Sequence, residues 1–504
     1  MRHVIATIAL TLLAMAPFGA TDHASGTDVR RHGVRVLQPV FGPSVHLFDP
    51  SRYPAGDKQY AGQPLPDAEP SVAVAPDGTV WVASLHEQHG TALWRGRAGA
   101  YPPTFIGQPD QGLGGDDVAL ALGTDTPISS GMTLTSTVVI TGTRAITAPP
   151  ASPAPANLYV AALAQVTGPA PAWRVAATAC PRGEVAYAFR SCIFYPHLVF
   201  GQRDRPWLAA YGRSTVYLSY LTRGDDVLSG HITAKRSDDA GTTWRVVGDP
   251  VAGLTAAAPA LPPLHGWPGN LAVDARDGTV YEVFVTATPG HDAGDRFNRL
   301  VVARSRDGGA TWRDTPVYQG QGGEDDANMW PGLAVDAGGR LYVAWSDRHR
   351  VLLSSSVDGG TTWSPARRGD TAVAGGVGLR SSVLPSVAAG AAGRVALAWY
   401  GSDARDNLAT GARWRVYAAT SSDGGATFNG AAVTLVIHQG PICSKGDACP
   451  WLARQLLDNL GLALDPRSGR AVIAYGRSIE FGDYRACRRA ANCPQTYYAE
   501  QTAP

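Results

Sequence analysis

The sequence predicts an all-β fold, a single β-propeller of four-stranded antiparallel blades, from its composition, a repeated strand pattern and a repeated turn motif. Glycine and proline are abundant among the 504 residues, with 58 and 37 copies, and charged residues make up only 17%. This composition favours many short strands joined by turns over helical bundles, coiled coils or disorder. Hydrophobic residues reach 44%, so the chain can bury a large core.

A two-strand phrase recurs seven times along the chain. Its second strand is β-branched or aromatic, as in residues 79–84 (TVWVAS) and 340–345 (RLYVAW), and most copies follow a glycine turn. A small apolar strand precedes each turn, and its aligned alanines are on average about 65 residues apart: Ala73, Ala121, Ala209, Ala272, Ala334, Ala388 and Ala463. A unit of that length holds one four-stranded sheet with its loops, and radial repetition protects the sheet edges.

This repeat predicts seven blades, with six as the alternative. The second copy is irregular, because it carries the Pro/Ala-rich stretch 147–156. We expect the propeller to span residues 67–504, and residues 27–66 to form an N-terminal segment able to close the ring by pairing with the last blade.

An export signal precedes the propeller. Arg2 is followed by the apolar run 4–16, which is too short for a bilayer span of ~20 residues but fits a secretory signal peptide. We expect residues 1–26 to contain this signal peptide and a short mature stretch. No other window has the character of a membrane span, so the protein is predicted to be secreted and extracellular.

The cysteine spacing agrees with export. Six cysteines fall into three close pairs, which favours disulfides: Cys180 with Cys192, Cys443 with Cys449, and Cys487 with Cys493. Metal binding is the alternative, although structural zinc prefers shorter gaps between its ligands. The net charge of +1 requires no nucleic-acid or membrane partner, and we predict neither; we expect a monomer.

A second motif, Ser-x-Asp-x-Gly-x-Thr-Trp/Phe, occurs four times, each after a strand-like run. Its residues are Ser237, Asp239, Gly241, Thr243 and Trp244; Ser305, Asp307, Gly309, Thr311 and Trp312; Ser356, Asp358, Gly360, Thr362 and Trp363; and Ser421, Asp423, Gly425, Thr427 and Phe428. The pattern resembles the Asp-box, or bacterial neuraminidase (BNR) repeat, of the sialidase superfamily, over roughly residues 70–478. We expect a structural role, because the side chains can bond a tight hairpin and the aromatic ring can anchor it.

The topology of a four-stranded blade places its connections on two opposite faces. The glycine turns and the Ser-x-Asp turns share one face, which we call the turn face. The longer loops, which follow strand 2 or lead into strand 1, share the other, which we call the loop face. Carboxylates, arginines and aromatics gather on the loop face, a composition that suits a sugar. For any single acid, the alternative is that it accepts hydrogen bonds from backbone groups at the ring centre.

The resemblance implies a glycosidase with a Tyr nucleophile paired with a Glu, an Asp acid/base, and arginines that bind a substrate carboxylate. The family's Phe/Tyr-Arg-Ile-Pro motif is absent, so the candidates are chosen by their position on the loop face. The catalytic candidates are Asp204, Glu69 and Tyr400. The substrate-binding candidates are Arg205, Arg380, Arg477, Trp207, Trp267 and Trp330.

We therefore expect a secreted, sialidase-like glycoside hydrolase that acts on terminal sugars of extracellular glycans, with a carbohydrate or glycoconjugate as its partner and no cofactor. Two alternatives stay open: a non-catalytic propeller that binds glycans or proteins, and a glycosidase of different specificity that uses paired carboxylates. The acidic loop Glu324-Asp325-Asp326 offers oxygen ligands for Ca²⁺, but a solvated loop is the other interpretation, and no metal site is predicted.

Overall fold

The protein is an all-β propeller, as the sequence predicts. A computed structural model describes residues 29–31, 34–36, 38–47, 67–86, 91–107, 116–124, 136–138, 157–166, 172–179, 193–198, 203–212, 214–222, 231–239, 243–251, 267–286, 297–321, 330–371, 373, 378–444, 449, 453–456, 458–478 and 494–503. Within these ranges there are β-strands and no α-helix. Nor do they contain a helix long and apolar enough to cross a bilayer.

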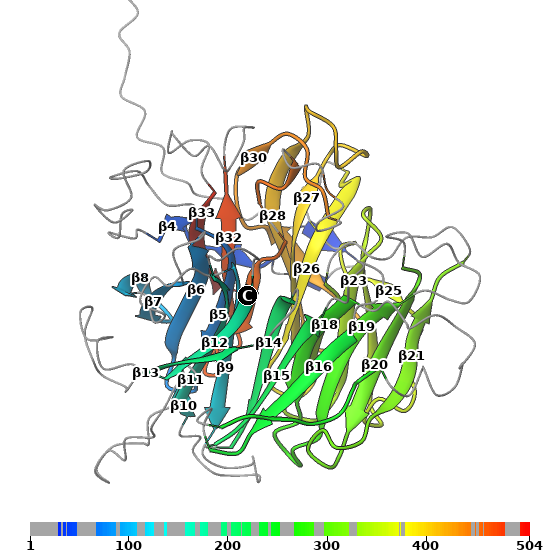
Figure 1. The fold of residues 1–504 in the computed structure, drawn as a ribbon. Coiled ribbons are helices and arrows are strands. Elements are labelled where there is room, and N and C mark those ends of the chain that lie inside the picture. Colours follow the sequence, from blue (N-terminus) through cyan, green and yellow to red (C-terminus); the bar gives the residue numbers. More distant parts are fainter. Residues whose placement is uncertain are drawn as a thin grey trace, which may run out of the picture.

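The strands form successive sheets around one axis (Figure 1). The first blade contains β5 (Asp67–Val74), β6 (Thr79–His86), β7 (Thr91–Arg97) and β8 (Ala100–Gly107). The second contains β9 (Asp116–Thr124), β10 (Ser136–Val138), β11 (Asn157–Val166), β12 (Ala172–Ala179) and β13 (Ile193–Leu198). The third contains β14 (Arg203–Tyr211), β15 (Thr215–Thr222), β16 (His231–Ser237) and β17 (Arg245–Val246).

The remaining sheets complete the ring. The fourth blade contains β18 (Trp267–Val273), β19 (Val280–Thr286), β20 (Arg299–Ser305) and β21 (Arg313–Gln319). The fifth contains β22 (Gly332–Val335), β23 (Leu341–Ser346), β24 (Val351–Ser356) and β25 (Arg367–Arg368). The sixth contains β26 (Ser381–Ala389), β27 (Val395–Ser402), β28 (Arg413–Ser421), β29 (Asn429–Ala432) and β30 (His438–Gln439). The seventh contains β31 (Gly461–Leu464), β32 (Ala471–Arg477), β33 (Gln495–Ala503), β3 (Val40–Phe41) and β4 (Val45–His46).

Six of these sheets are regular blades built on four antiparallel strands. The second sheet departs from the pattern, because the short β10 pairs antiparallel with β9 and parallel with β11. It is the copy that the sequence marks as irregular. The first strands contact one another in the order β5, β9, β14, β18, β22, β26 and β31, and β31 contacts β5 again. The small residues of these strands permit close approach around the axis.

The seventh blade combines both ends of the chain. β33 pairs with β32 on one side and with β3 and β4 on the other. The edge of β33 is therefore covered by residues from the N-terminal segment. β1 (Val29–Arg31) and β2 (Val34–Val36) form a separate two-stranded sheet.

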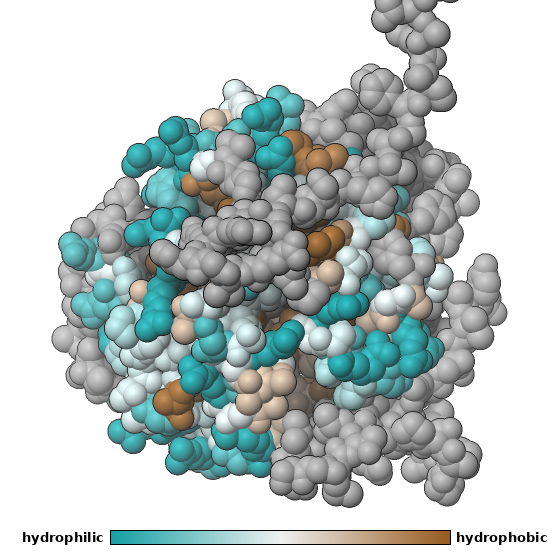
Figure 2. Space-filling model, turned by 180° about the vertical axis from the view of Figure 1, so that it is seen from behind, coloured by the Kyte–Doolittle hydropathy of each residue, from teal (hydrophilic) through white to brown (hydrophobic). Residues whose placement is uncertain are grey.

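The second strands of the fourth, fifth and sixth blades lie in the core. Every residue of β19, β23 and β27 is buried, because neighbouring blades cover both faces of the sheet. Continuously apolar strands are the sequence signature of such two-sided burial. On the face opposite to that of Figure 1, the residues that the structure describes are mostly hydrophilic or intermediate in hydropathy, and the hydrophobic ones lie in small separate areas (Figure 2).

The Ser-x-Asp turns are held by their own side chains. At Asp358, the carboxylate accepts hydrogen bonds from the Ser356 hydroxyl (2.8 Å) and from the backbone N–H and hydroxyl of Thr362 (2.9 and 2.6 Å). The Gly360 N–H donates to the Ser356 hydroxyl at 2.9 Å, and Gly360 has a positive φ of 79°. The same bonds recur at Asp307 and Asp423. A local polar network thus holds each turn, and the aromatic residue that follows it packs against a hydrophobic cluster, as at Trp312, Trp363 and Phe428.

Cys443 and Cys449 form a disulfide. The other cysteine pairs predicted from the sequence lie outside the described residues: Cys180 with Cys192, and Cys487 with Cys493. The predicted signal peptide and the acidic loop at residues 324–326 also lie outside them.

Candidate functional site

A cavity of about 150 Å³ lies where the first strands of the blades meet. Its walls come from blades all around the ring, including Ser71, Ala119, Trp207, Asn270, Trp330, Ser386, Asp458 and Asn459. Trp330, Asp458 and Asn459 precede a first strand, whereas the other residues of this set lie within the first strands, near the axis. The volume is below the ~300–1,000 Å³ typical of sites for drug-sized ligands, so the cavity has room for one small ring.

The backbone is distorted where it borders this cavity. The pairing register shifts between Ala68 and Ser71, and between Val383 and Ser386, in the first strands of two blades. Proline lies in each bulge and cannot donate a ladder hydrogen bond. Three residues that directly precede a proline here have positive φ: Glu69 (51°), Trp330 (39°) and Leu384 (53°). Strained backbone of this kind needs support from its surroundings and is frequent at functional sites.

Two of the predicted aromatic residues border the cavity. Trp330 is 5% exposed, and Trp207 is half-buried and packs against the cluster that contains Trp330 and Leu384. Since they come from the third and fifth blades, the structure brings together two residues that are far apart in the sequence. An indole face is suited to stacking on the C–H surface of a sugar ring.

Glu69 lies behind the cavity wall. It is 2% exposed, and its Oε1 accepts a hydrogen bond from the backbone N–H of Asp458 at 2.9 Å. This bond joins the first blade to the segment that leads into the seventh. Glu69 thus accepts a backbone hydrogen bond, as the sequence allows for acids at the ring centre.

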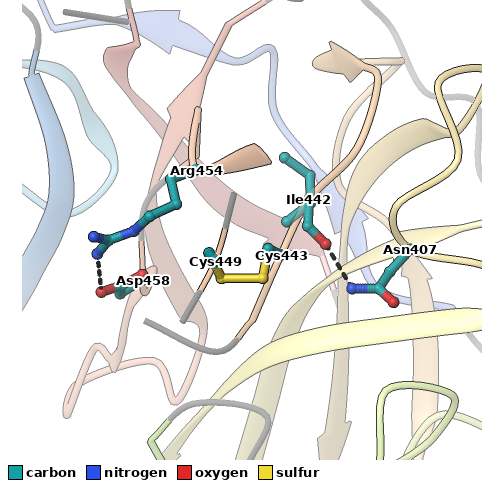
Figure 3. Close-up of a disulfide and its surroundings, with 6 residues drawn as sticks. All are labelled: Asn407, Ile442, Cys443, Cys449, Arg454 and Asp458. Carbon is teal, nitrogen blue, oxygen red and sulfur yellow. Dashed lines mark hydrogen bonds and ion pairs between the residues drawn. A yellow bond between two sulfur atoms is a disulfide. The ribbon is translucent and has the colours of Figure 1, made fainter. Parts of the chain in front are cut away.

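An ion pair lies beside Glu69. The Arg454 guanidinium contacts the Asp458 carboxylate at 2.7 Å, and their side chains are only 12% and 7% exposed (Figure 3). Burial of either charge alone would be costly, so the two stabilise each other. The Cys443–Cys449 disulfide lies close to them, on the segment where Asn407 Nδ2 donates to the Ile442 carbonyl at 2.7 Å. Arg454 and Asp458 both lie ahead of β31, the first strand of the seventh blade, but no local sequence pattern predicts that they pair.

The Asn270 side chain joins the fourth blade to the fifth through hydrogen bonds to the Leu333 backbone. Its Nδ2 donates to the Leu333 carbonyl at 2.7 Å, and its Oδ1 accepts from the Leu333 N–H at 2.5 Å. Ser71 has a similar role, because its hydroxyl accepts from the Leu120 N–H at 3.1 Å. These side chains substitute for strand partners that the inner strands lack near the axis.

Tyr400 has a different environment from the one the sequence suggests. Its side chain is fully buried, and its hydroxyl accepts a hydrogen bond from the Gly476 N–H at 3.0 Å. Burial raises the pKa of the Tyr400 hydroxyl well above its usual range. Because both factors oppose formation of an accessible phenolate, we do not include Tyr400 in the site.

The two described arginines among the substrate-binding candidates lie apart from the cavity walls. Arg380 is exposed, and its carbonyl accepts from the His349 ring Nδ1 at 2.9 Å. Arg477 is half-buried, with its guanidinium carbon 4.8 Å from the ring centroid of Tyr497. Asp204, Arg205 and Trp267 are placed by backbone only, at the loop-face ends of β14 and β18. Their side chains lie outside the described atoms.

The site offers carboxylate, guanidinium, amide and indole groups around a small cavity. Among the described residues, no three His, Cys, Asp or Glu side chains group in a way that could hold a metal ion. The chemistry that these residues themselves can supply is hydrogen bonding, stacking and proton transfer by a carboxylate.

Comparisons with known proteins assign no family to this chain. No protein-family model and no curated protein matches the chain. Solved structures with a similar fold include a protein of unknown function from Dyadobacter fermentans, with 13% identity, 91% of this chain and 97% of that chain covered, and a TM-score of 0.42. An α-L-arabinanase from Penicillium chrysogenum has 10% identity, with 92% of this chain and 98% of that chain covered and a TM-score of 0.42. A sialidase from Trypanosoma rangeli has 11% identity, with 93% of this chain and 60% of that chain covered and a TM-score of 0.39. These identities and TM-scores assign neither a family nor an activity.

Proposed function

We propose that this protein is a secreted, carbohydrate-active glycoside hydrolase that binds a terminal sugar of an extracellular glycan in the central cavity. The observation that carries the proposal is the composition of the cavity wall, where Asp458 and the indoles of Trp207 and Trp330 border a space the size of one ring. Export is supported by the N-terminal apolar run and by the Cys443–Cys449 disulfide.

In this proposal, the indoles stack on the sugar and the carboxylates act on the glycosidic bond. Glycosidases commonly use one carboxyl group as acid and another as base or nucleophile. Asp458 borders the cavity, and Glu69 bonds the backbone of the same residue, so they form the candidate pair. Arg454 holds Asp458 in place through their ion pair.

A second function, sugar binding without hydrolysis, is favoured by a specific observation. Both candidate carboxylates already have structural partners, since Glu69 accepts from a backbone N–H and Asp458 is paired with Arg454. A carboxylate that is engaged in this way can hold the cavity in shape and still donate no proton to a leaving group.

One experiment separates the two functions. The purified protein is incubated with chromogenic and natural glycans, including sialosides, arabinans and β-glucans, and binding is measured on the same panel. For a hydrolase, Asp458→Asn is expected to lower kcat by roughly 10²–10⁴-fold. Trp207→Phe is expected mainly to raise KM. Asp277→Asn, on an exposed turn-face residue, is the matched control and should change neither.

For a binding protein, the expected result is saturable binding without turnover. Asp458→Asn would then keep most of the binding, whereas Trp207→Ala would lose it; circular dichroism establishes that each variant is folded. Turnover that Asp458→Asn leaves unchanged would contradict the assignment of the site. Absence of both turnover and binding across the panel would contradict the proposed function as a whole.

A further inference from the structure

One blade carries a glutamate at a core position that is aliphatic elsewhere in the ring. Glu282 lies in β19, the second strand of the fourth blade. The equivalent residues of five other second strands are Val82, Leu218, Val343, Leu397 and Ile473. The repeat therefore specifies an apolar side chain here, and a carboxyl group is an exception that requires an explanation.

The Glu282 side chain is buried in the junction between the third and fourth blades. Its exposed fraction is 0%, and that of Ser219, on β15 of the third blade, is also 0%. Along β19, Val280, Glu282 and Phe284 point to the same side, where Val280 packs with Tyr217 and Phe284 packs with Ile232 and Val251 of the third blade. Within the described residues, neither Glu282 oxygen has a hydrogen-bond partner of normal geometry.

This environment favours the neutral acid. Burial raises the pKa of the Glu282 carboxyl from 4.5 to about 8. The nearby Ser219 hydroxyl lowers the pKa by a smaller amount, and the Asp249 carboxylate raises it. An ionised carboxylate without a cation or a set of hydrogen bonds is strongly disfavoured in a protein interior.

Other charged or titratable groups face this junction from the elements packed around it. They are Tyr217 on β15, Arg236 on β16, Asp249 after β17, Arg299 on β20 and Asp314 on β21. Arg236 contacts Asp238 at 2.5 Å and lies 5.6 Å from the ring centroid of Tyr217. Of the groups in this set, Asp249 is the one whose charge changes the pKa of Glu282.

The junction is one strand away from the central cavity. Ser219 pairs in register with Trp207, and Glu282 pairs with Leu271, the neighbour of Asn270. Trp207 and Asn270 both border the cavity. A separation of β15 from β19 would therefore disturb the two first strands that place these side chains.

We propose that Glu282 is a proton-controlled lock between the third and fourth blades, which packs as a neutral acid and loosens the junction beside the central cavity when it ionises. The junction is expected to lose stability as the pH rises, because the Glu282 carboxyl binds its proton more tightly in the folded state than in the unfolded state. The stabilisation is complete below the unfolded pKa of about 4.5 and is lost as the pH rises towards about 8. This proposal is independent of the substrate of the cavity.

Hydrogen exchange with mass spectrometry tests the lock in the full chain. After correction for intrinsic exchange rates, exchange in β15 and β19 is expected to rise by about tenfold per pH unit between pH 5 and 8. Exchange in β27 of the sixth blade serves as the internal reference. In Glu282→Gln and Glu282→Leu, the pH-dependent increase in β15 and β19 should be absent. Asp249→Asn, which keeps Glu282, should retain the increase and shift it to lower pH.

Infrared spectroscopy of the wild-type protein provides a readout that does not depend on a variant folding. A protonated carboxylic C=O band should persist at pH 6 and titrate with a midpoint near pH 8; Glu282→Gln should lack it. The proposal is overturned if the wild-type protein shows no such band at pH 6. It is equally overturned if Glu282→Gln and Glu282→Leu retain the wild-type pH dependence of exchange in β15 and β19.

Discussion

At the scale of single residues, polar side chains hold the turns, and a few ionisable side chains are buried in the core. In the Ser-x-Asp turns, hydrogen bonds from Thr311 and then Ser305 lower the pKa of Asp307 to about 2. At His438, burial dominates instead and lowers the pKa to about 4, although the ring Nδ1 donates to the Ser478 carbonyl at 2.7 Å. The two residues illustrate opposite preferences, because hydrogen bonds stabilise the charged form of an acid and burial destabilises the charged form of a base.

Asp307→Ala is expected to lower the free energy of unfolding by about 1 kcal/mol, because the turn loses three hydrogen bonds that are screened by solvent. Urea unfolding at pH 7 measures the change. Asp406→Ala, at an exposed carboxylate that accepts from the Leu408 N–H at 2.9 Å, is the control and should cost less. Equal costs for the two variants would contradict the role assigned to the turn network.

The titration of His438 should contribute to the pH dependence of stability. Because the folded pKa of about 4 lies below the unfolded value of 6.5, the unfolded state binds the proton more tightly, and stability falls as the pH drops through this window. His438→Asn keeps a side-chain donor and cannot titrate, so its midpoint of thermal unfolding should vary less between pH 7 and 4. Ser478→Ala retains both the imidazole and the carbonyl, and should show the wild-type slope. An unchanged slope in His438→Asn would refute this account.

At the scale of elements, arginines on the turn face join several neighbouring blades. Arg394 Nη1 donates to the Gly469 carbonyl at 2.8 Å, from the sixth blade to the seventh, and Arg276 Nη1 donates to the Gly338 carbonyl at 2.5 Å. Gly469 has a positive φ of 66°, and a Cβ there would lie 2.5 Å from the Arg394 guanidinium. Glycine is therefore needed both for the backbone conformation of the turn and to leave space for the guanidinium of the neighbouring arginine.

A double-mutant cycle tests the contact between Arg394 and Gly469. Gly469→Ala is expected to cost about 1–3 kcal/mol, through backbone strain and displacement of Arg394. Arg394→Ala should cost about 1 kcal/mol, and the double variant should be less destabilised than the sum because the clash is gone. Gly99→Ala is the control, since Gly99 has a positive φ of 81° and nothing lies within 4 Å of its added Cβ. Coupling of Arg394 to Gly99, or additivity with Gly469, would contradict the mechanism.

At the scale of the whole molecule, closure of the ring depends on pairing between the two ends of the chain. β33 is bordered by β3 and β4, and His46 of β4 stacks on Tyr497 with ring centroids 5.2 Å apart. Because first-blade and seventh-blade strands also contact each other directly, the ring is closed both at its axis and at its outer strands.

Removal of residues 1–47 is expected to lower the thermal unfolding midpoint by several degrees and to promote association, because β33 becomes an open sheet edge. Differential scanning fluorimetry and size-exclusion chromatography measure the two effects. Removal of residues 1–37, which keeps β3 and β4, is the control and should preserve the midpoint and the elution volume. The closure mechanism fails if the two truncated proteins behave alike.

The fold class, the blade pattern and the assignment of turns and loops to opposite faces all follow from local patterns in the sequence. Strand character and turn chemistry are local properties, so Gly360 or the residues of β23 are recognisable without knowledge of their neighbours. The irregularity of the second blade is also visible in the sequence, because the Pro/Ala-rich stretch 147–156 falls between β10 and β11. Trp207 and Trp330 are recognisable in the same way, because Trp207 lies in the first strand of the third blade and Trp330 lies shortly before that of the fifth.

The roles of individual polar residues depend instead on contacts that form only in the folded ring. Glu69 bonds a residue 389 positions away, Tyr400 is buried by a neighbouring blade, and Asp458 finds its partner in Arg454. A side chain's burial and hydrogen bonds depend on which blade packs against it, and that contact is absent from any local pattern. For the same reason Glu282 appears in the sequence as one more strand residue, while its protonation is a property of the assembled ring.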